Sequence, residues 1–228
     1  MSIDSNLSQA KVFVVGLPRT ATTSLCVAML ELGFKTAHTA FTQDAFTQAQ
    51  VIADAPIFAD FVKLSQVYPE AKFIYLQREL SAWLPSIQQL LRRMHKNIVR
   101  PDGGFNPHLK RVYQQVFQPF NIKNIDDVMF LAQCYQQHQL NVEAWFSNQP
   151  SRLLKLDVAN PGSFDALVEF LQQHQLLPMN QLISNKAFKP INIAGKVTAW
   201  QQISHPNKVE STRFGKVDKL AFLTDDLR

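Results

Sequence analysis

The sequence predicts an α/β fold of three layers, in which helices cover both faces of a central parallel sheet. Three short runs of β-branched, aliphatic and aromatic residues, at 11–16, 72–76 and 152–156, have the composition of buried strands. A segment with apolar residues at helical spacing follows each run. The first run also leads through a polar loop into a helix, which is the opening typical of nucleotide-binding α/β domains.

The first strand and helix have clear boundaries in the sequence. The run at 11–16 ends in Gly16, and the loop 17–20 follows it. Leu25, Met29 and Leu32 then recur at helical spacing until Gly33, which is a common helix terminator. The sequence therefore predicts a strand, a short loop and a helix in direct succession.

The rest of the chain alternates between the two kinds of element until its last fifth. The strongest loop signal is the Gly- and Pro-rich segment 100–107. From about residue 179 the pattern weakens, and we expect an irregular tail within a single domain that spans 1–228. Helices are predicted at 58–68, 80–94, 125–146 and 164–174, and the second and third strands at 72–76 and 152–156.

The composition is that of a globular protein and narrows the function only slightly. The 228 residues are 46% hydrophobic and 18% charged, and the formal net charge is +5, which favours an anionic ligand without identifying it. Cys26 and Cys134 lie in apolar helical segments and are expected to be free thiols rather than metal ligands or a disulfide. With no apolar leader and no run near the ~20 residues of a membrane span, we expect a cytoplasmic protein.

The loop after the first strand has the chemistry of an anion site. A loop at that point directs backbone N–H groups and the positive end of a helix dipole toward one place. Arg19 adds a charged, forked donor. The hydroxyl groups of the segment come from Thr20, Thr22, Thr23 and Ser24. A simple helix-capping turn is the alternative, although capping needs fewer polar groups.

This loop differs from the phosphate loop of P-loop kinases, GxxxxGK[ST], in its cation. Aligned on Gly16, the second glycine falls on Ala21, the lysine on Thr22 and the last hydroxyl on Thr23. The lysine that neutralises a polyphosphate is therefore absent, and the cation is Arg19 instead. The pattern favours a ligand with one phosphate group next to the group that is transferred, rather than a polyphosphate.

At these residues the chain resembles the sulfotransferase family. Members open with a strand and a P-[RK]-[ST]-G-T-T loop that binds the 5'-phosphosulfate of PAPS, and Pro-Arg-Thr-Ala-Thr-Thr at 18–23 matches all positions but one. Ala21 replaces the glycine, and it would be strained if the position requires a positive φ. The resemblance implies the P-loop-like sulfotransferase fold. It also implies that PAPS is held by Pro18, Arg19, Thr20, Ala21, Thr22, Thr23 and Ser24.

A second element of the family is an arginine that ends a later strand, with a serine eight residues on. Arg78 and Ser86 match it, and the resemblance implies that they hold the 3'-phosphate of PAPS. A surface arginine and a helix serine are the alternatives. The family's late basic element matches only loosely, at Arg213 and Lys216.

The catalytic residues implied by the resemblance are Arg19, His38 and Asp54. Arg19 would neutralise the oxygen that bridges to the leaving phosphate. His38, with an ordinary pKa near 6.5, or Asp54 would accept the proton of the acceptor. A backbone-bonded loop histidine and a helix-capping aspartate are the alternatives. The basic cluster at 92–100 is interpreted as a solvated helix end.

The function implied is metal-independent transfer of a sulfuryl group from PAPS to a hydroxyl or amine of a small-molecule or carbohydrate acceptor, with no nucleic-acid partner. Two alternatives stay open, an unusual P-loop kinase and a non-catalytic nucleotide-binding protein. The sequence leaves the acceptor and the oligomeric state open.

Overall fold

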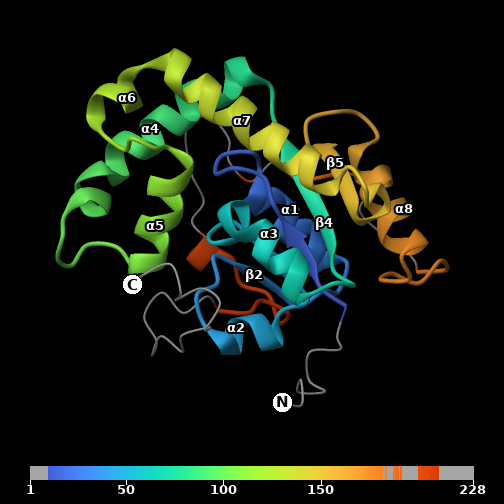
Figure 1. Cartoon of the computed structure of the whole chain (residues 1–228). Helices are drawn as coiled ribbons and strands as arrows, with labels where there is room; N and C mark the ends of the chain where they lie inside the picture. The colour runs from blue at the N-terminus through green and yellow to red at the C-terminus, as the bar shows by residue number, and fades with distance from the viewer. Residues whose placement is uncertain (1–9, 182, 184–186, 190, 192–199, 211–228) are drawn as a thin grey trace.

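The computed structural model describes residues 10–181, 183, 187–189, 191 and 200–210, and its centre is a five-stranded parallel sheet (Figure 1). The order of the strands across the sheet is β2-β3-β1-β4-β5, so the first strand is central. The strands are β1 (Val12–Val14), β2 (Thr36–His38), β3 (Val51–Ala53), β4 (Lys72–Gln77) and β5 (Leu153–Asp157). The predicted α/β fold with a central parallel sheet is confirmed.

Helices connect the strands and form the outer layers. They are α1 (Thr22–Glu31), α2 (Gln43–Gln48), α3 (Ile57–Val67), α4 (Leu80–Val99), α5 (Pro107–Val116), α6 (Ile122–Asp126), α7 (Val128–Phe146) and α8 (Ser163–Gln173). Two short 3-10 turns are η2 (Pro150–Arg152) and η3 (Trp200–Gln202). None of the described helices combines the length and hydropathy that a membrane crossing requires.

The two faces of the sheet are built by the alternation of side chains along each strand. In β1, Val12 and Val14 face a cluster that includes residues of α1 and α8. Phe13 lies between them and faces the opposite cluster, which includes residues of α3 and α7. Both faces are therefore apolar, as expected for a parallel sheet that is covered on two sides.

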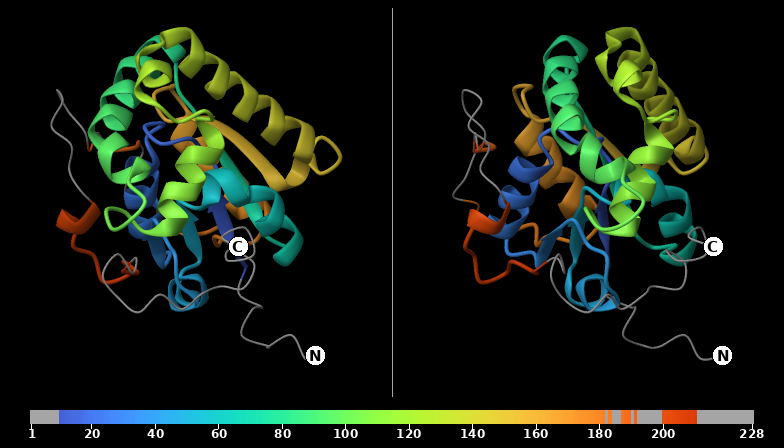
Figure 2. Two further views of the ribbon diagram at one scale, coloured as in Figure 1. Left: turned by 60° about the vertical axis from the view of Figure 1, so that its left-hand side comes forward. Right: turned by 90° about the vertical axis from the view of Figure 1, so that its left-hand side faces the viewer.

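A third cluster joins α4, α5, α6 and α7 to the carboxyl ends of the strands. Leu17 follows β1 and Ala55 follows β3, and both pack with residues of these helices. Figure 2 shows α4 to α7 gathered together at one side of the sheet. The bidentate ion pair of Arg111 with Asp60, at 2.9 and 2.5 Å, joins α5 to α3. Helices α4–α7 therefore pack beside the carboxyl edge of the sheet.

The sequence missed β2 and β3, the helices α2 and α5, and the separate short helix α6 before α7. Each of the two missed strands has only three residues, which is too short to display a period of two. Three of the five strands and the helices after them fall where they were predicted, within a few residues.

The described part of the tail contacts the body of the fold. Residues 200–202 form η3, and Lys208 makes a parallel bridge to Thr36 in β2. Trp200 is part of the cluster that includes α1 and α8. The assignment of the whole chain to one domain stays a prediction.

Candidate active site

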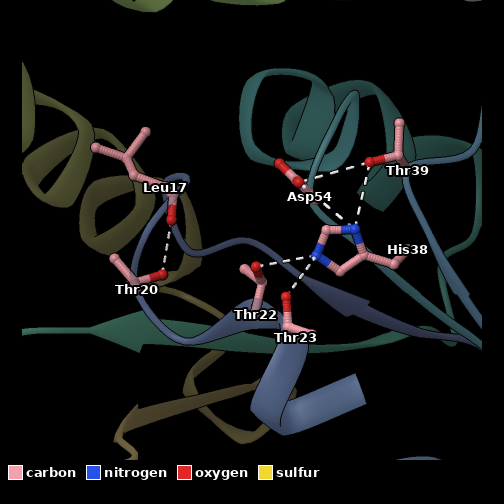
Figure 3. Close-up of polar contacts among 7 residues, drawn as sticks. All are labelled: Leu17, Thr20, Thr22, Thr23, His38, Thr39 and Asp54. Carbon is pink, nitrogen blue, oxygen red and sulfur yellow. Dashed lines mark hydrogen bonds and ion pairs between the residues drawn. The ribbon is translucent and has the colours of Figure 1, made fainter. Parts of the chain in front are cut away.

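The loop between β1 and α1 has a backbone conformation that residues other than glycine rarely adopt. Arg19 has a φ of 75° and Ala21 a φ of 71°, both in the left-handed region. Thr20 lies fully buried between them and donates its hydroxyl to the carbonyl of Leu17 at 2.7 Å (Figure 3). Thr20 therefore shapes the turn from within. Ala21 stands at the positive φ that the family glycine would tolerate, so the strain expected from this departure is present.

The first turn of α1 has backbone donors directed at the loop. Its N-cap residue is Ala21, whose side chain cannot accept a hydrogen bond from the first amides. Thr22, Thr23 and Ser24 follow directly, and α1 runs for ten residues. Uncapped amides and the helix dipole together make this end of α1 suited to an anion.

Arg78 and Ser86 lie against this loop, although they are about 60 residues away in the sequence. Arg78 Nη1 donates to the carbonyl of Arg19 at 2.8 Å, and Arg19 Nε donates to Ser86 Oγ at 2.8 Å. Trp83 Nε1 donates to the carbonyl of Pro18 at 2.9 Å. The hydroxyl of Tyr135 accepts from the backbone N–H of Arg78 and donates to its carbonyl. The two sequence windows thus form one site.

Positive charge accumulates at the loop. Burial lowers the pKa of the Arg19 guanidinium, and the charges of Arg78 and Arg93 lower it further, while Tyr113 and Asp54 act in the opposite direction. Among the described residues, no carboxylate forms an ion pair with any of the three arginines. Three interacting cations without a counter-ion favour the binding of a polyanion.

Arg93 and Tyr113 are near the loop electrostatically, and the sequence analysis did not include them in the site. Arg93 is exposed, which agrees with a solvated helix end, and its charge acts to lower the pKa of both Arg19 and Tyr113. It lies seven residues after Ser86 in α4, so both are on one face of the helix. That spacing was visible in the sequence. Tyr113 is in α5, which the sequence did not predict.

His38 stands between the anion loop and Asp54 (Figure 3). Its Nε2 lies 3.2 Å from Thr22 Oγ1 and 3.5 Å from Thr23 Oγ1. Its Nδ1 lies 3.6 Å from Asp54 Oδ2, and the hydroxyl of Thr39 lies within 3.5 Å of both groups. One ring nitrogen therefore faces the anion loop and the other faces a carboxylate.

The ends of the edge strand β2 and of its neighbour β3 carry this pair. His38 ends β2, and Asp54 follows β3 at once. Thr39 has a φ of 69° and Asp54 a φ of 63°. Asp54 Oδ1 is buried and has no hydrogen-bond partner among the described residues. Backbone strain and an unpaired carboxylate oxygen at one place are typical of functional sites.

The ionisation of His38 suits a base. Burial lowers the pKa of the imidazole, and the Asp54 carboxylate partly opposes this effect. The neutral ring is therefore favoured at pH 7, and it has a free lone pair to accept a proton.

Two predicted residues cannot be placed. Arg213 and Lys216 lie outside the described residues. In the part of the chain that the structure describes, no three His, Cys, Asp or Glu side chains are grouped as metal ligands.

A parallel α/β sheet with a polar loop after its central strand, and a His–Asp pair beside that loop, is the arrangement of many nucleotide-binding α/β proteins. A family model described as a sulfotransferase domain matches residues 11–44 and 39–180. The chain therefore belongs to the sulfotransferase family, and sulfuryl transfer is the general chemistry of its domain. A search of curated proteins finds no match to the chain.

Proposed function

We propose that this chain transfers a sulfuryl group from PAPS to a hydroxyl or amine of a small-molecule or carbohydrate acceptor. The observation that carries the proposal is the placement of His38 Nε2 at 3.2 Å from Thr22, in the first turn of the anion-binding helix. A base and an anion site in contact are what transfer from a bound anion to a nearby nucleophile requires.

The donor set of the site fits PAPS, which has charge at both ends. The first turn of α1, with Arg19, suits the 5'-phosphosulfate. Arg78, which donates to the Arg19 carbonyl, and Ser86, which accepts from Arg19 Nε, suit the 3'-phosphate. A Cβ on Gly16 would lie 2.5 Å from both Leu76 Cβ and Thr20 Oγ1, so the loop is closely packed behind the site. When bound, PAPS would supply the sulfuryl group for in-line transfer.

His38 acts as the general base in this proposal, and Asp54 orients it. Neutral His38 takes the proton that the acceptor's hydroxyl or neutral amine loses as its oxygen or nitrogen bonds to sulfur. Asp54 lies toward the other ring nitrogen at 3.6 Å and stabilises the imidazolium that forms. Thr39, within reach of both groups, supports their relative orientation.

Arg19 stabilises the charge that develops on the leaving phosphate. Its Nε is used by Ser86, but its terminal nitrogens form no hydrogen bond with the described residues. Those nitrogens remain available for the bridging oxygen, where a fixed positive charge lowers the barrier. Catalysis is then mostly positioning and charge stabilisation, as in phosphoryl transfer.

The test compares three nucleotides in thermal unfolding without added Mg²⁺. The ligand 3',5'-ADP should stabilise the protein more than 5'-AMP or ATP does. At ~100-fold its dissociation constant, 3',5'-ADP should raise the free energy of unfolding by about 2.7 kcal/mol relative to the free protein. In the control variant Arg78→Met, the advantage of 3',5'-ADP over 5'-AMP should disappear. Equal stabilisation of the wild type by all three ligands would contradict the proposed 3'-phosphate site.

Turnover separates the enzyme from the alternatives. Sulfation of a panel of phenols, alcohols, amines and sugars with PAPS would support transfer. Binding of 3',5'-ADP with no turnover on the panel would favour a nucleotide-binding protein. Stabilisation by ATP only when Mg²⁺ is added would favour a kinase.

A further inference from the structure

Trp200, in the tail, lies on the ring of the candidate base. The ring centroids of His38 and Trp200 are 5.5 Å apart and the planes differ by 25°, which is an offset stack. Trp200 is only 7% exposed. It is outside the region that matches the family, which ends at residue 180.

The segment around Trp200 is attached to the strand that carries His38. The backbone N–H of Thr36 in β2 donates to the carbonyl of Asn207 at 3.0 Å, and the N–H of Val209 donates to the carbonyl of Thr36 at 2.9 Å. Asn207 Nδ2 donates to the carbonyl of Gly33 at 3.1 Å. His38 is two residues beyond Thr36, so the tail is hydrogen-bonded to the same short strand that carries the candidate base.

The polar contacts of His38 direct its ring but restrain it only weakly. They run from 3.2 to 3.6 Å, which is long for hydrogen bonds, and all of them involve the ring nitrogens at its edge. Contacts of this length resist rotation of the ring about its Cβ–Cγ bond less than short hydrogen bonds would. A flat side chain against one face of the ring supplies the missing restraint.

The indole is itself held by a cation. Lys208 Nζ lies 5.5 Å from the centroid of the Trp200 ring, and the Lys208 side chain is almost buried. Lys208 is also paired with Glu210 at 3.0 Å. The charged groups around this stack include Asp54, beside the His38 ring, and Lys208, beyond the indole.

From this geometry we propose that Trp200 is a positioning residue, which holds the plane of His38 and shields one face of its ring from water. The inference rests on the proposed function, in which His38 is the base. Sulfuryl transfer by this chain thus needs a segment that lies beyond the matched sulfotransferase region.

A simple packing role explains the tryptophan less well. Trp200 Nε1 is buried and has no hydrogen-bond partner among the described residues. A buried donor without a partner is unfavourable, and an apolar side chain would fill the cluster without that cost. An aromatic ring beside His38 is the feature that such a replacement would lose.

Shielding has a defined sign for the ionisation of His38. Burial lowers the pKa of the imidazole. Removal of the indole lets water solvate the imidazolium, so the pKa rises, and the acidic limb of the rate profile moves to higher pH. The Asp54 carboxylate, which raises the same pKa, is unchanged by this substitution.

The experiment uses the full chain with Trp200→Ala, Trp200→Leu and Trp200→Phe. Trp145→Ala is the control, because Trp145 lies in α7 and belongs to a different apolar cluster. We expect Trp200→Ala and Trp200→Leu to lower kcat about 10- to 100-fold with the KM for PAPS unchanged. Trp200→Phe keeps a ring and removes the unpaired donor, so it should restore most of the rate. The control should keep the wild-type pH profile.

A direct measurement of His38 separates this inference from the proposed function. The His38 imidazole is titrated by NMR, with His38→Gln used for assignment. If Trp200→Ala raises the pKa of His38 while the wild type sulfates no acceptor, the proposed function fails and the shielding stands. If Trp200→Leu equals Trp200→Phe in kcat and in the His38 titration, the stacking role is overturned. If Trp200→Ala does not fold, the Leu and Phe variants decide.

Discussion

The centre and the edge of the sheet contribute different halves of the site. At the centre, the segments that follow β1 and β4 supply Arg19 and Arg78, which are joined by a hydrogen bond of 2.8 Å. Toward one edge, the edge strand β2 and its inner neighbour β3 supply His38 and Asp54, whose nearest polar atoms are 3.6 Å apart. The central half is bonded directly through backbone and side chain, and the edge half is a looser pair.

This difference separates anion binding from proton transfer. In the proposed function, the nucleotide needs fixed donors, which a close-packed loop and two arginines would provide. A base must approach and release a proton, and its contacts tighten only when the acceptor is present. Substitutions at the centre should therefore affect charge stabilisation and nucleotide binding, and substitutions at the edge should affect turnover and its pH dependence.

The largest effect is expected at Arg19. Arg19→Ala should lower turnover by ~10²–10³-fold, because it removes the charge at the bridging oxygen. Arg19→Lys should retain partial activity, since a point charge can still meet one oxygen. Both replacements are non-glycine residues at a φ of 75°, so the melting temperature should change little. Steady-state turnover with PAPS and melting curves measure both quantities.

Arg92→Ala is the control for the loss of one charge. Arg92 neighbours Arg93 in α4 but pairs with Asp126 at 2.6 Å, outside the site. Near-normal turnover in Arg19→Ala would reduce Arg19 to a residue of the helix-capping turn.

The second-largest effect on turnover is expected for His38 and Asp54. His38→Ala should lower turnover by roughly 10²-fold while the affinity for 3',5'-ADP stays near that of the wild type. Asp54→Asn should cost less, because Asp54 acts through His38. Since the Asp54 carboxylate raises the pKa of His38, its removal lowers that pKa, and the acidic limb of the rate profile moves to lower pH. Rate profiles between pH 5 and 8 measure the shift.

Calorimetry with 3',5'-ADP provides the control for the edge variants, because an intact centre should bind it equally well. A larger rate loss in Asp54→Ala than in His38→Ala would make Asp54 the base and reverse the two roles.

The smallest effect is expected at Ala21. Its left-handed φ of 71° is unfavourable for alanine and open to glycine. Ala21→Gly should therefore stabilise the protein by about 0.5 kcal/mol, after the entropy that glycine adds to the unfolded chain. Ala28→Gly, inside the same helix, is the matched control and should destabilise by about 1 kcal/mol or more. Denaturant unfolding distinguishes them, and destabilisation by both would mean that the loop is not strained.

The same division explains what the sequence could predict. β1, β4 and β5 have apolar runs that end in recognisable loops, so the anion half was located through Arg19, Arg78 and Ser86. β2 is Thr-Ala-His and β3 is Val-Ile-Ala, and neither has a pattern that distinguishes a strand from a loop. Their pairing in the sheet, rather than local propensity, makes them strands.

For the half of the site at β2 and β3, the sequence therefore named residues but did not predict how they are arranged. His38 and Asp54 were named from the resemblance, but their contact depends on the neighbouring order of β2 and β3, which no local pattern states. Trp200 was missed for the same reason, because a stack between residues 162 positions apart leaves no local signal. The catalytic roles of these residues stay predictions.

The pairing of the tail with β2 also bears on the behaviour of the protein in concentrated solution. An uncovered edge strand presents its N–H and C=O groups to other chains and can seed sheet-to-sheet aggregation. At Thr36 both backbone groups are already used, by Asn207 and Val209 of the same chain. The tail therefore covers the sheet edge at Thr36, and we expect these residues, which lie outside the matched family region, to reduce pairing of β2 with other chains.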